Sequence, residues 1–284
     1  MRSIQELLKE KYITLSKGQK KVADLLLKDI IGFSMSTASQ IAKQAEVSET
    51  TVIRLSYNLD FDSFSQMQKF LQKEYLTQKE KAESLLKHEN KPKNQDFIDR
   101  IIENEIEILG SLKNSLSMDN YWAAIDYIMN ADEVKIVGYR ASYSAAHWMY
   151  LKLNMLRNNV HMISTNMTGY PDDLLIDEDK KVVFIFISLP SYVAQSLEIA
   201  QTAKKQGAKL ITITDHLLSP ISRISDISFT TQINTNSETF IPISSILCLL
   251  NIIATGIEIK YEKEVMERVL KLQKLHKEQE LFLE

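Results

Sequence analysis

Side chains that bind anions and sugar hydroxyls gather at three points of the sequence where a short apolar run ends. The side chains at these points are Arg140 and Ser142, then Ser188, Ser191 and Tyr192, and finally Thr212, Thr214, Asp215 and His216. Helical patterns follow the first two points, and the free N–H groups and dipole of a helix start attract anions. Arg140 adds a charge-assisted contact. We therefore expect a small anionic ligand here; the alternative is that the serines only cap their helices.

Catalytic and metal-binding signatures are absent from the sequence. Its seven glycines form neither GxxxxGK[ST] nor GxGxxG, and its five histidines include no HExxH arrangement. Glu238 and His216 are the acid/base candidates near the ligand loops, but exposed loop residues of these types are usually only solvated. We expect no catalytic residue, no metal and no cofactor, and we place Glu238 among the ligand contacts. The single cysteine, Cys248, excludes an intramolecular disulfide framework, and its apolar neighbours predict a core thiol.

A second group of polar side chains is spaced to contact nucleic acid, within residues 39–64 (SQIAKQAEVSETTVIRLSYNLDFDSF). Ser48 has the side chain of a helix N-cap. The pattern of Glu49–Leu59 predicts a helix whose Val52 and Leu55 pack against Ala42 of a preceding helix. The opposite face carries polar side chains suited to base edges and phosphates, namely Ser48, Thr50, Thr51, Arg54 and Tyr57. The pattern predicts a helix-turn-helix; the alternative is an ordinary amphipathic helix pair.

Two features qualify this DNA-binding interpretation. Glu46 stands where the turn favours glycine, since a left-handed backbone costs a residue with a side chain roughly 1 kcal/mol. Arg54 is the only cation of the second helix. Most phosphate affinity must therefore come from lysines on other helices, for which the candidates are Lys17, Lys20, Lys21 and Lys43.

The charge of the chain is divided unevenly along its 284 residues. Residues 1–93 hold 16 Lys and Arg against 12 Asp and Glu, a net charge of +4, which leaves −7 for the remainder. A basic first third on an acidic body suits DNA binding at one end. No apolar signal-peptide core begins the sequence, so we expect a cytoplasmic protein. The apolar run Ile241–Ile259 is interrupted by polar residues, and we expect a buried helix rather than a membrane span.

The periodicity of the chain separates two regions. Residues 1–77 have helical period throughout, which predicts an all-α domain. Residues 78–95 are rich in Lys and Glu and reach Pro92, which is typical of a linker. In residues 96–284, short β-rich runs alternate with helical patterns, which predicts an α/β domain with a doubly wound parallel sheet. The run Val182–Ile187 is so apolar that both of its faces must be covered.

In this order of parts the chain resembles the RpiR-type (MurR/RpiR) bacterial transcriptional regulators. That family joins an N-terminal helix-turn-helix domain to a C-terminal sugar-isomerase-like (SIS) domain with a flavodoxin-like sheet. The first half of the resemblance rests on Leu15-Ser16, Lys20–Ala23, Ile41-Ala42, Val47–Arg54, Leu59, Phe61 and Phe64. The second half rests on Gly138–Ser142, Ile187-Ser188, Ala203–Ala208, Ile213–Asp215 and Ser219–Ile221.

The resemblance implies a phosphosugar effector, and Ser142 and Ser188 match the ligand serines of the family. The chain departs from the family pattern at two kinds of position. Members usually carry glycine where this chain has Glu46, Asp60 and Ser63. Their phosphate loop usually reads Ser-x-Ser-Gly-x-Thr/Ser, whereas Ser188–Val193 reads SLPSYV and lacks the final hydroxyl.

These observations predict a DNA-binding transcriptional regulator of sugar or amino-sugar metabolism. We expect its binding to a palindromic operator to be modulated by a phosphosugar, and we expect a homodimer or tetramer. Two alternatives remain open. In the first alternative, the chain is a sugar-phosphate isomerase with an accessory helical domain. In the second, it is a DNA-binding protein whose second domain only dimerises.

Overall fold

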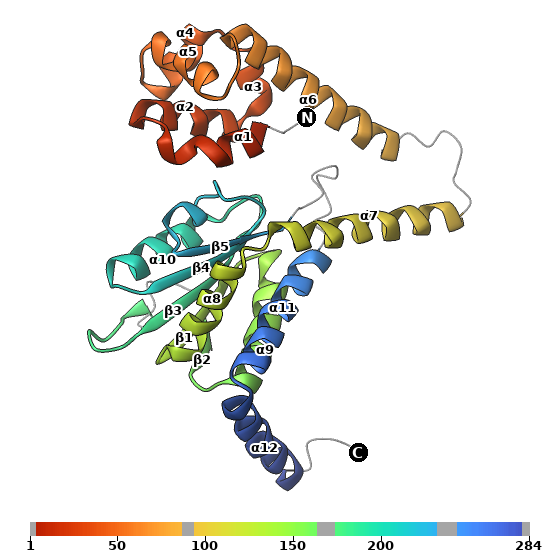
Figure 1. The fold of residues 1–284 in the computed structure, drawn as a ribbon, viewed down its shortest axis with the longest axis vertical. Coiled ribbons are helices and arrows are strands. Elements are labelled where there is room, and N and C mark those ends of the chain that lie inside the picture. Colours follow the sequence, from red (N-terminus) through yellow and green to blue (C-terminus); the bar gives the residue numbers. More distant parts are fainter. Residues whose placement is uncertain (1–3, 87–93, 164–173, 232–242, 280–284) are drawn as a thin grey trace. The chain divides into compact units, whose positions relative to one another are not determined.

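The structure is a computed structural model that describes residues 4–86, 94–163, 174–231 and 243–279. It contains two compact units, Met1–Pro92 and Lys93–Glu284, which are described separately (Figure 1). The division falls within the stretch 78–95 that the sequence predicts as a linker. The last helix of the first unit occupies the beginning of that stretch and ends at Leu86.

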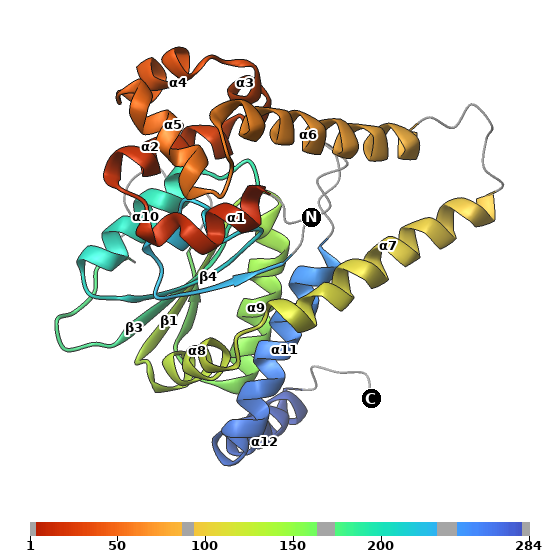
Figure 2. The same cartoon turned by 45° about the horizontal axis from the view of Figure 1, so that its top comes forward.

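The first unit consists of helices. Several of them begin directly after a residue whose polar side chain caps the helix. The helices are α1 (Ile4–Lys11), a 3-10 turn (Tyr12–Thr14), α2 (Lys17–Lys28), α3 (Ile30–Met35), α4 (Ala38–Ala45), α5 (Glu49–Asn58) and α6 (Phe64–Leu86). Ser16 and Thr37 each form a capping box, in which the cap side chain and a glutamine three residues later bind each other's backbone N–H. In Figure 2, α6 continues past the bundle of the shorter helices.

One predicted helix boundary in this unit is wrong. The sequence suggests that the second helix runs to about Gly32, but α2 ends at Lys28. Asp29 starts a separate short helix because its carboxylate accepts the Gly32 N–H at 2.8 Å. An aspartate N-cap satisfies a free backbone donor, and so a new helix begins here.

The core of the first unit confirms the predicted packing of the helix pair. Ala42, Val52 and Leu55 are buried, and α2, α4 and α5 pack against one another. The turn between α4 and α5 places Glu46 in the left-handed conformation, with φ 53°. Asp60, at a second position where the family favours glycine, also has a positive φ of 65°.

The second unit is built around a five-stranded parallel sheet. Its strands are β1 (Glu133–Gly138), β2 (Val160–Met162), β3 (Val182–Ile187), β4 (Lys209–Thr214) and β5 (Ile227–Thr230). They follow the order β2-β1-β3-β4-β5, and every neighbouring pair is parallel. The helices are α7 (Asn94–Ser115), α8 (Met118–Asn130), α9 (Ser142–Leu156), α10 (Ala194–Lys205), α11 (Ser244–Lys260) and α12 (Glu262–Glu278). The predicted doubly wound sheet is confirmed.

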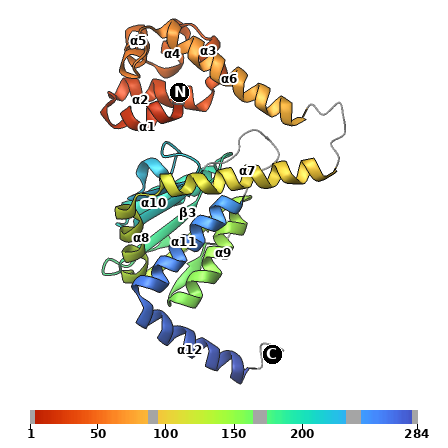
Figure 3. The ribbon, with the colours of Figure 1, turned by 45° about the vertical axis from the view of Figure 1, so that its right-hand side comes forward.

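Both faces of the central strand β3 are covered, as its sequence predicts. Val183, Ile185 and Ile187 belong to a core shared with α8, α9 and α11. The alternate residues Phe184 and Phe186 belong to a second core with α10. Figure 3 shows α8, α9 and α11 together on one side of the sheet. Burial on two sides explains why this strand lacks polar alternation.

The apolar run near the end of the chain forms α11, which is largely buried in the second unit. Within the described residues, no single helix is both long and apolar enough to cross a membrane. The pair α11 and α12 passes that test of length and composition when joined, but the two helices meet at a bend of 103°. Cys248 on α11 is half-buried rather than a fully enclosed core thiol.

Candidate functional site

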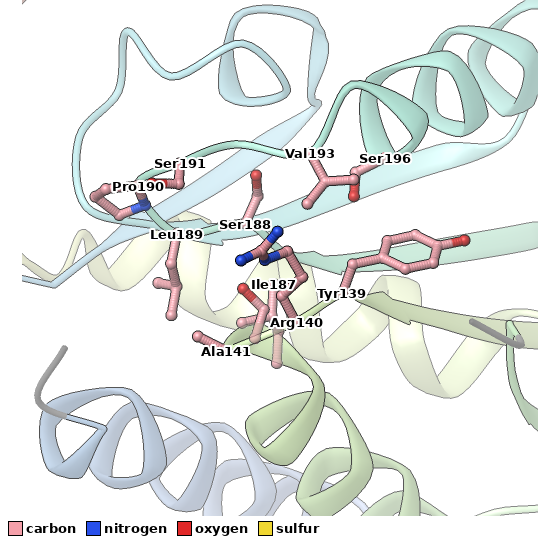
Figure 4. Close-up of a pocket in the computed structure, with 11 residues that line it drawn as sticks. Tyr139, Arg140, Ala141, Ile187, Ser188, Leu189, Pro190, Ser191, Val193 and Ser196 are labelled. Atoms are coloured by element: carbon pink, nitrogen blue, oxygen red, sulfur yellow. The ribbon is translucent and has the colours of Figure 1, made fainter. Parts of the chain in front are cut away.

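The strand order brings two of the three predicted polar points together. β1 and β3 are neighbours, and the chain winds away from them in opposite directions, which makes their carboxyl ends the expected place for a ligand. A pocket of about 290 Å³ lies there, between the strand ends and the starts of α9 and α10. Its lining includes Ser142 together with Arg140, Ser188 and Ser191, and the last three are labelled in Figure 4.

The end of β1 delivers a cation and a serine to this pocket. A Cβ at Gly138 would lie only 2.5 Å from the Ala146 Cβ, so glycine allows α9 to pack closely on the strand. Arg140 then adopts a left-handed backbone with φ 54°, and its guanidinium reaches toward Ser188 in Figure 4. A non-glycine residue in this conformation is strained, and such strain is concentrated at functional sites. Ser142 follows at the start of α9 and is 5% exposed.

The end of β3 supplies the opposite wall of the pocket. Ser188 donates its backbone N–H to the Ile213 carbonyl at 3.0 Å, and this bond holds Ser188 to β4. Ser188 is 5% exposed. Ser191 is the second strained residue of the pocket, with φ 65°. Val193 is the N-cap of α10 and makes no side-chain cap hydrogen bond.

Four serine hydroxyls of the pocket are free to bind a ligand. They belong to Ser142, Ser188, Ser191 and Ser196, and none has a hydrogen-bond partner among the residues that the structure describes. The N-caps of α9 and α10 are Ala141 and Val193, so none of these serines caps its helix. Ser196 is a pocket residue that the sequence analysis missed. Its spacing of three from Val193 would have indicated it, since residues three apart share a helix face.

The third predicted polar point does not join the pocket lining. The Tyr192 hydroxyl donates to Asp215 Oδ1 at 2.7 Å and lies 3.0 Å from His216 Nε2. Burial and the neighbouring Asp215 carboxylate raise the pKa of Tyr192. Burial also lowers the pKa of His216, whose Nδ1 accepts the Leu218 N–H at 3.2 Å. The hydroxyl of Tyr192, which the sequence suggests as a ligand contact, is therefore already paired, and Tyr192 is not among the residues that line the pocket.

Glu238 and Tyr139 are two further polar residues of the second unit. Glu238, which the sequence suggests as a ligand contact, lies outside the described residues. Tyr139 is among the residues that line the pocket, and its buried hydroxyl lacks a partner within the described ranges. Burial raises the pKa of that hydroxyl. In the same part of the chain, no group of three or more His, Cys, Asp or Glu side chains is arranged to hold a metal.

The predicted DNA-reading side chains divide into two sets on α5. Ser48 accepts the Thr51 N–H at 3.3 Å, and the two hydroxyls lie 2.9 Å apart, so both serve the start of the helix. Thr50, Arg54 and Tyr57 are exposed and follow one another at spacings of four and three. These spacings place them on one helix face. The open part of the predicted reading surface is therefore this second set.

The predicted phosphate-binding lysines are also not equivalent. Lys17 and Lys43 are exposed. Lys21 Nζ lies 3.5 Å from a carboxylate oxygen of Glu46, the strained residue of the turn. Lys20 Nζ lies 5.5 Å from the centre of the Tyr12 ring. The Glu46 carboxylate therefore offsets part of the positive charge that Lys21 adds near α5.

Comparisons with known proteins agree with this architecture. The family model for the helix-turn-helix domain of the rpiR family matches residues 2–78, and the SIS domain model matches residues 127–254. The regulator HexR of Escherichia coli K12, an HTH-type transcriptional regulator, is 24% identical over 282 residues. That match covers 93% of this chain and 91% of HexR.

Solved structures share the fold. The NanR protein of Vibrio vulnificus, solved in complex with ManNAc-6P, has a TM-score of 0.58 at 15% identity and covers 98% of this chain and 100% of its own. The sugar isomerase domain of an RpiR transcription factor from Sphaerobacter thermophilus has a TM-score of 0.55 at 19% identity. It covers 62% of this chain and 97% of that domain. Because both characteristic domains are matched in the same order and a relative of nearly full length is a regulator, the chain belongs to the RpiR-type family of transcriptional regulators.

Proposed function

We propose that this regulator binds a phosphosugar in the pocket at the ends of β1 and β3, and that the phosphosugar modulates its binding to operator DNA. The observation that carries the proposal is a set of four serine hydroxyls beside the Arg140 guanidinium, none of which is paired within the described ranges. Hydroxyl donors and a guanidinium satisfy the oxygens of a phosphate group. The complex of the related NanR with ManNAc-6P supports an amino-sugar phosphate as the first ligand to test.

The DNA partner is contacted through α5 in this proposal. Thr50, Arg54 and Tyr57 face the bases, while Lys17 and Lys43 bind the phosphates. Side-chain contacts to base edges specify a sequence, whereas phosphate contacts set affinity and its dependence on salt. Arg54→Ala should weaken operator binding and relax its specificity, whereas Lys43→Ala should weaken binding to all sequences alike.

The regulator works as a homodimer or tetramer in this proposal, on a palindromic operator. The support is an exposed apolar stripe on α9, formed by Trp148, Leu151 and Met155, which are 40%, 49% and 50% exposed. Contiguous apolar surface of this kind marks interaction sites, and a second copy would cover it. An effector that changes the arrangement of subunits would change the spacing of paired α5 helices and so alter operator affinity.

The test combines genomic footprinting with a ligand screen. Footprinting names the operator and the neighbouring genes, and hence the sugar pathway. Operator fragments are then titrated with the full-length protein in the presence of ManNAc-6P, other hexose 6-phosphates and inorganic phosphate. A shift in operator affinity with one sugar phosphate supports the proposal. Operator binding that no sugar phosphate alters, together with unchanged thermal unfolding, would favour the alternative in which the second domain only dimerises.

The isomerase alternative makes a different demand on the pocket. Aldose–ketose interconversion needs a positioned acid or base. Among the described residues that line the pocket, the polar groups are hydroxyls and one guanidinium, without a carboxylate or imidazole. This observation favours the regulator, and Glu238 stays the untested acid/base candidate. Turnover of a sugar phosphate by the full-length protein, abolished by Glu238→Gln, would establish the enzyme instead.

A further inference from the structure

We infer that Ser196 is a ligand-binding residue and that it takes the place of the hydroxyl missing from position 193. This inference rests on the proposed phosphosugar site and assigns one of its contacts. The pocket side of α10 begins with Val193, which has no oxygen to offer as an N-cap. Ser196 lies one helical turn further along and lines the same pocket.

The side chain of Ser196 lies on the pocket side of α10. Residues three apart on a helix lie on the same face, so a pocket that contacts Val193 also meets Ser196. Figure 4 shows both side chains at the start of α10, on the pocket side. Three residues of helix rise by about 4.5 Å, so the hydroxyl of Ser196 lies deeper along α10 than an N-cap hydroxyl would.

The hydroxyl of Ser196 is available to a ligand. Ser196 is only 4% exposed, and its oxygen has no hydrogen-bond partner in the described part of the chain. That oxygen is not among the fully enclosed, unpartnered side-chain atoms of the described residues, so it keeps some contact with the pocket, where a ligand can reach it. The backbone N–H of Ser196 is already bonded to the Val193 carbonyl at 3.0 Å. The side chain, rather than the backbone, is therefore the donor that this residue offers to a ligand.

The hydrogen-bond donors around the pocket suit an oxyanion. Ser188 and Ser196 approach from β3 and α10, and Arg140 reaches across from β1. Donors that arrive from three elements suit an oxyanion with several terminal oxygens, as in a phosphate ester. The start of α10, a helix of 12 residues, contributes its free N–H groups and its dipole to the same anion.

The experiment measures binding of inorganic phosphate and of ManNAc-6P to the full-length protein by calorimetry. The variants are Ser196→Ala, Ser188→Ala as a positive control, and Ser196→Ala combined with Val193→Thr. A lost hydrogen bond to a charged group predicts that Ser196→Ala weakens binding of both probes by about tenfold or more. The added Val193→Thr should recover part of that loss, because it returns a hydroxyl to the same helix face.

The outcomes separate this inference from the proposal beneath it. If Ser188→Ala weakens binding and Ser196→Ala does not, Ser196 is not a ligand contact, while the phosphosugar site stands. If Ser196→Ala lowers the unfolding temperature and leaves both affinities unchanged, the hydroxyl has only a structural role and the inference is wrong. If the unmodified protein binds neither probe, the shared phosphate chemistry is absent, and both the site and this inference are overturned.

Discussion

The starts of α5 and α10 are both rich in hydroxyl side chains, yet they use them in opposite ways. At α5, Ser48 caps the helix and its hydroxyl lies 2.9 Å from that of Thr51. At α10, Val193 is the N-cap, and the nearby Ser191 and Ser196 hydroxyls have no partner among the described residues. The comparison teaches that a serine near a helix start keeps its hydroxyl available for other contacts where another residue has taken the cap position.

A residue with left-handed backbone precedes both helices. Glu46 precedes α5 in the left-handed conformation, and Ser191 precedes α10 in the same conformation. Near α5 the strained residue, Glu46, forms an ion pair with Lys21. The carboxylate of Glu46 therefore interacts with a side chain of the protein itself. Near α10 the strained residue lines the pocket with a free hydroxyl. The strained residue belongs to a turn in the first unit and to the lining of the pocket in the second.

The largest expected effect concerns Arg140, which follows β1 and lines the same pocket as the start of α10. Arg140→Gly should weaken binding of a sugar phosphate by about 1.5–3 kcal/mol, because a hydrogen bond to a charged group is lost. The same change should raise stability by about 0.5–1 kcal/mol, because glycine accepts the φ of 54° without strain. Calorimetry and chemical denaturation measure the two effects.

The matched control for this variant is Asn159→Gly. Asn159 also has a φ of 54°, but it is not among the residues that line the pocket. It should leave ligand affinity unchanged. Equal loss of affinity in both variants would show that Arg140 acts through the backbone and not through its guanidinium.

The next effect contrasts the two kinds of serine directly. Ser48→Ala should destabilise the first unit by about 1 kcal/mol, because the Thr51 N–H loses its cap. Ser188→Ala should leave the free energy of unfolding nearly unchanged and weaken sugar-phosphate binding instead, since its hydroxyl has no protein partner among the described residues. Denaturation curves of both variants measure the two free energies of unfolding. An equal loss of stability in Ser188→Ala would show that the two serines do not differ in this way.

Glu46 offers a smaller test at the α5 side. Glu46→Gly should stabilise the first unit by about 0.5–1 kcal/mol, because it relieves the left-handed strain. It should also release Lys21 for a DNA phosphate and steepen the dependence of operator affinity on salt by about 0.9 per released lysine. Glu46→Gln is the matched control, since it removes the charge and keeps the strain. It should reproduce the salt effect without the gain in stability.

The smallest effect concerns the hydroxyl of Tyr192, which is already paired. Burial lowers the pKa of the adjacent His216 in the folded chain below its ordinary value of 6.5, with Asp215 opposing and Arg223 reinforcing the shift. Above about pH 6.5 both folded and unfolded states are neutral at this residue, so it does not affect stability there. As the pH falls below 6.5, the unfolded chain takes up the proton first, and stability decreases until the folded pKa is reached.

Unfolding measured across this pH range should show the decrease in the unmodified protein and not in His216→Gln. His161→Gln, on an exposed side chain of β2, is the control and should retain it. A pH profile that is unchanged by His216→Gln would show that the pair of Tyr192 and His216 does not carry this dependence.

Much of the fold was predictable because its signals are local. Ser48 was recognised as a cap from its residue type and position, and the two-sided burial of β3 from six consecutive apolar residues. The end of α2 was misplaced because Asp29 can either continue a surface helix or cap a new one, and only its bond to the Gly32 N–H decides between them.

The candidate site was predictable in part. Arg140, Ser142, Ser188 and Ser191 were identified from their places after apolar runs, and the structure brings all four to one pocket. Ser196 was missed because it lies inside a helical pattern, where a serine usually faces solvent. Tyr192 was assigned to the pocket because it follows Ser191, but its ring turns toward Asp215 and His216.

By itself the sequence determined the type and order of the helices and strands, since apolar period and cap residues act within a few positions of the chain. It also determined which strand ends carry polar side chains. Only the tertiary structure decided that β1 and β3 are neighbours and that the hydroxyls beside them find no partner in the part of the chain that it describes. The physical reason is that a hydroxyl is free or occupied according to what lies within hydrogen-bond distance. At the starts of α5 and α10, that depends on which residue takes the cap and which elements pack around it.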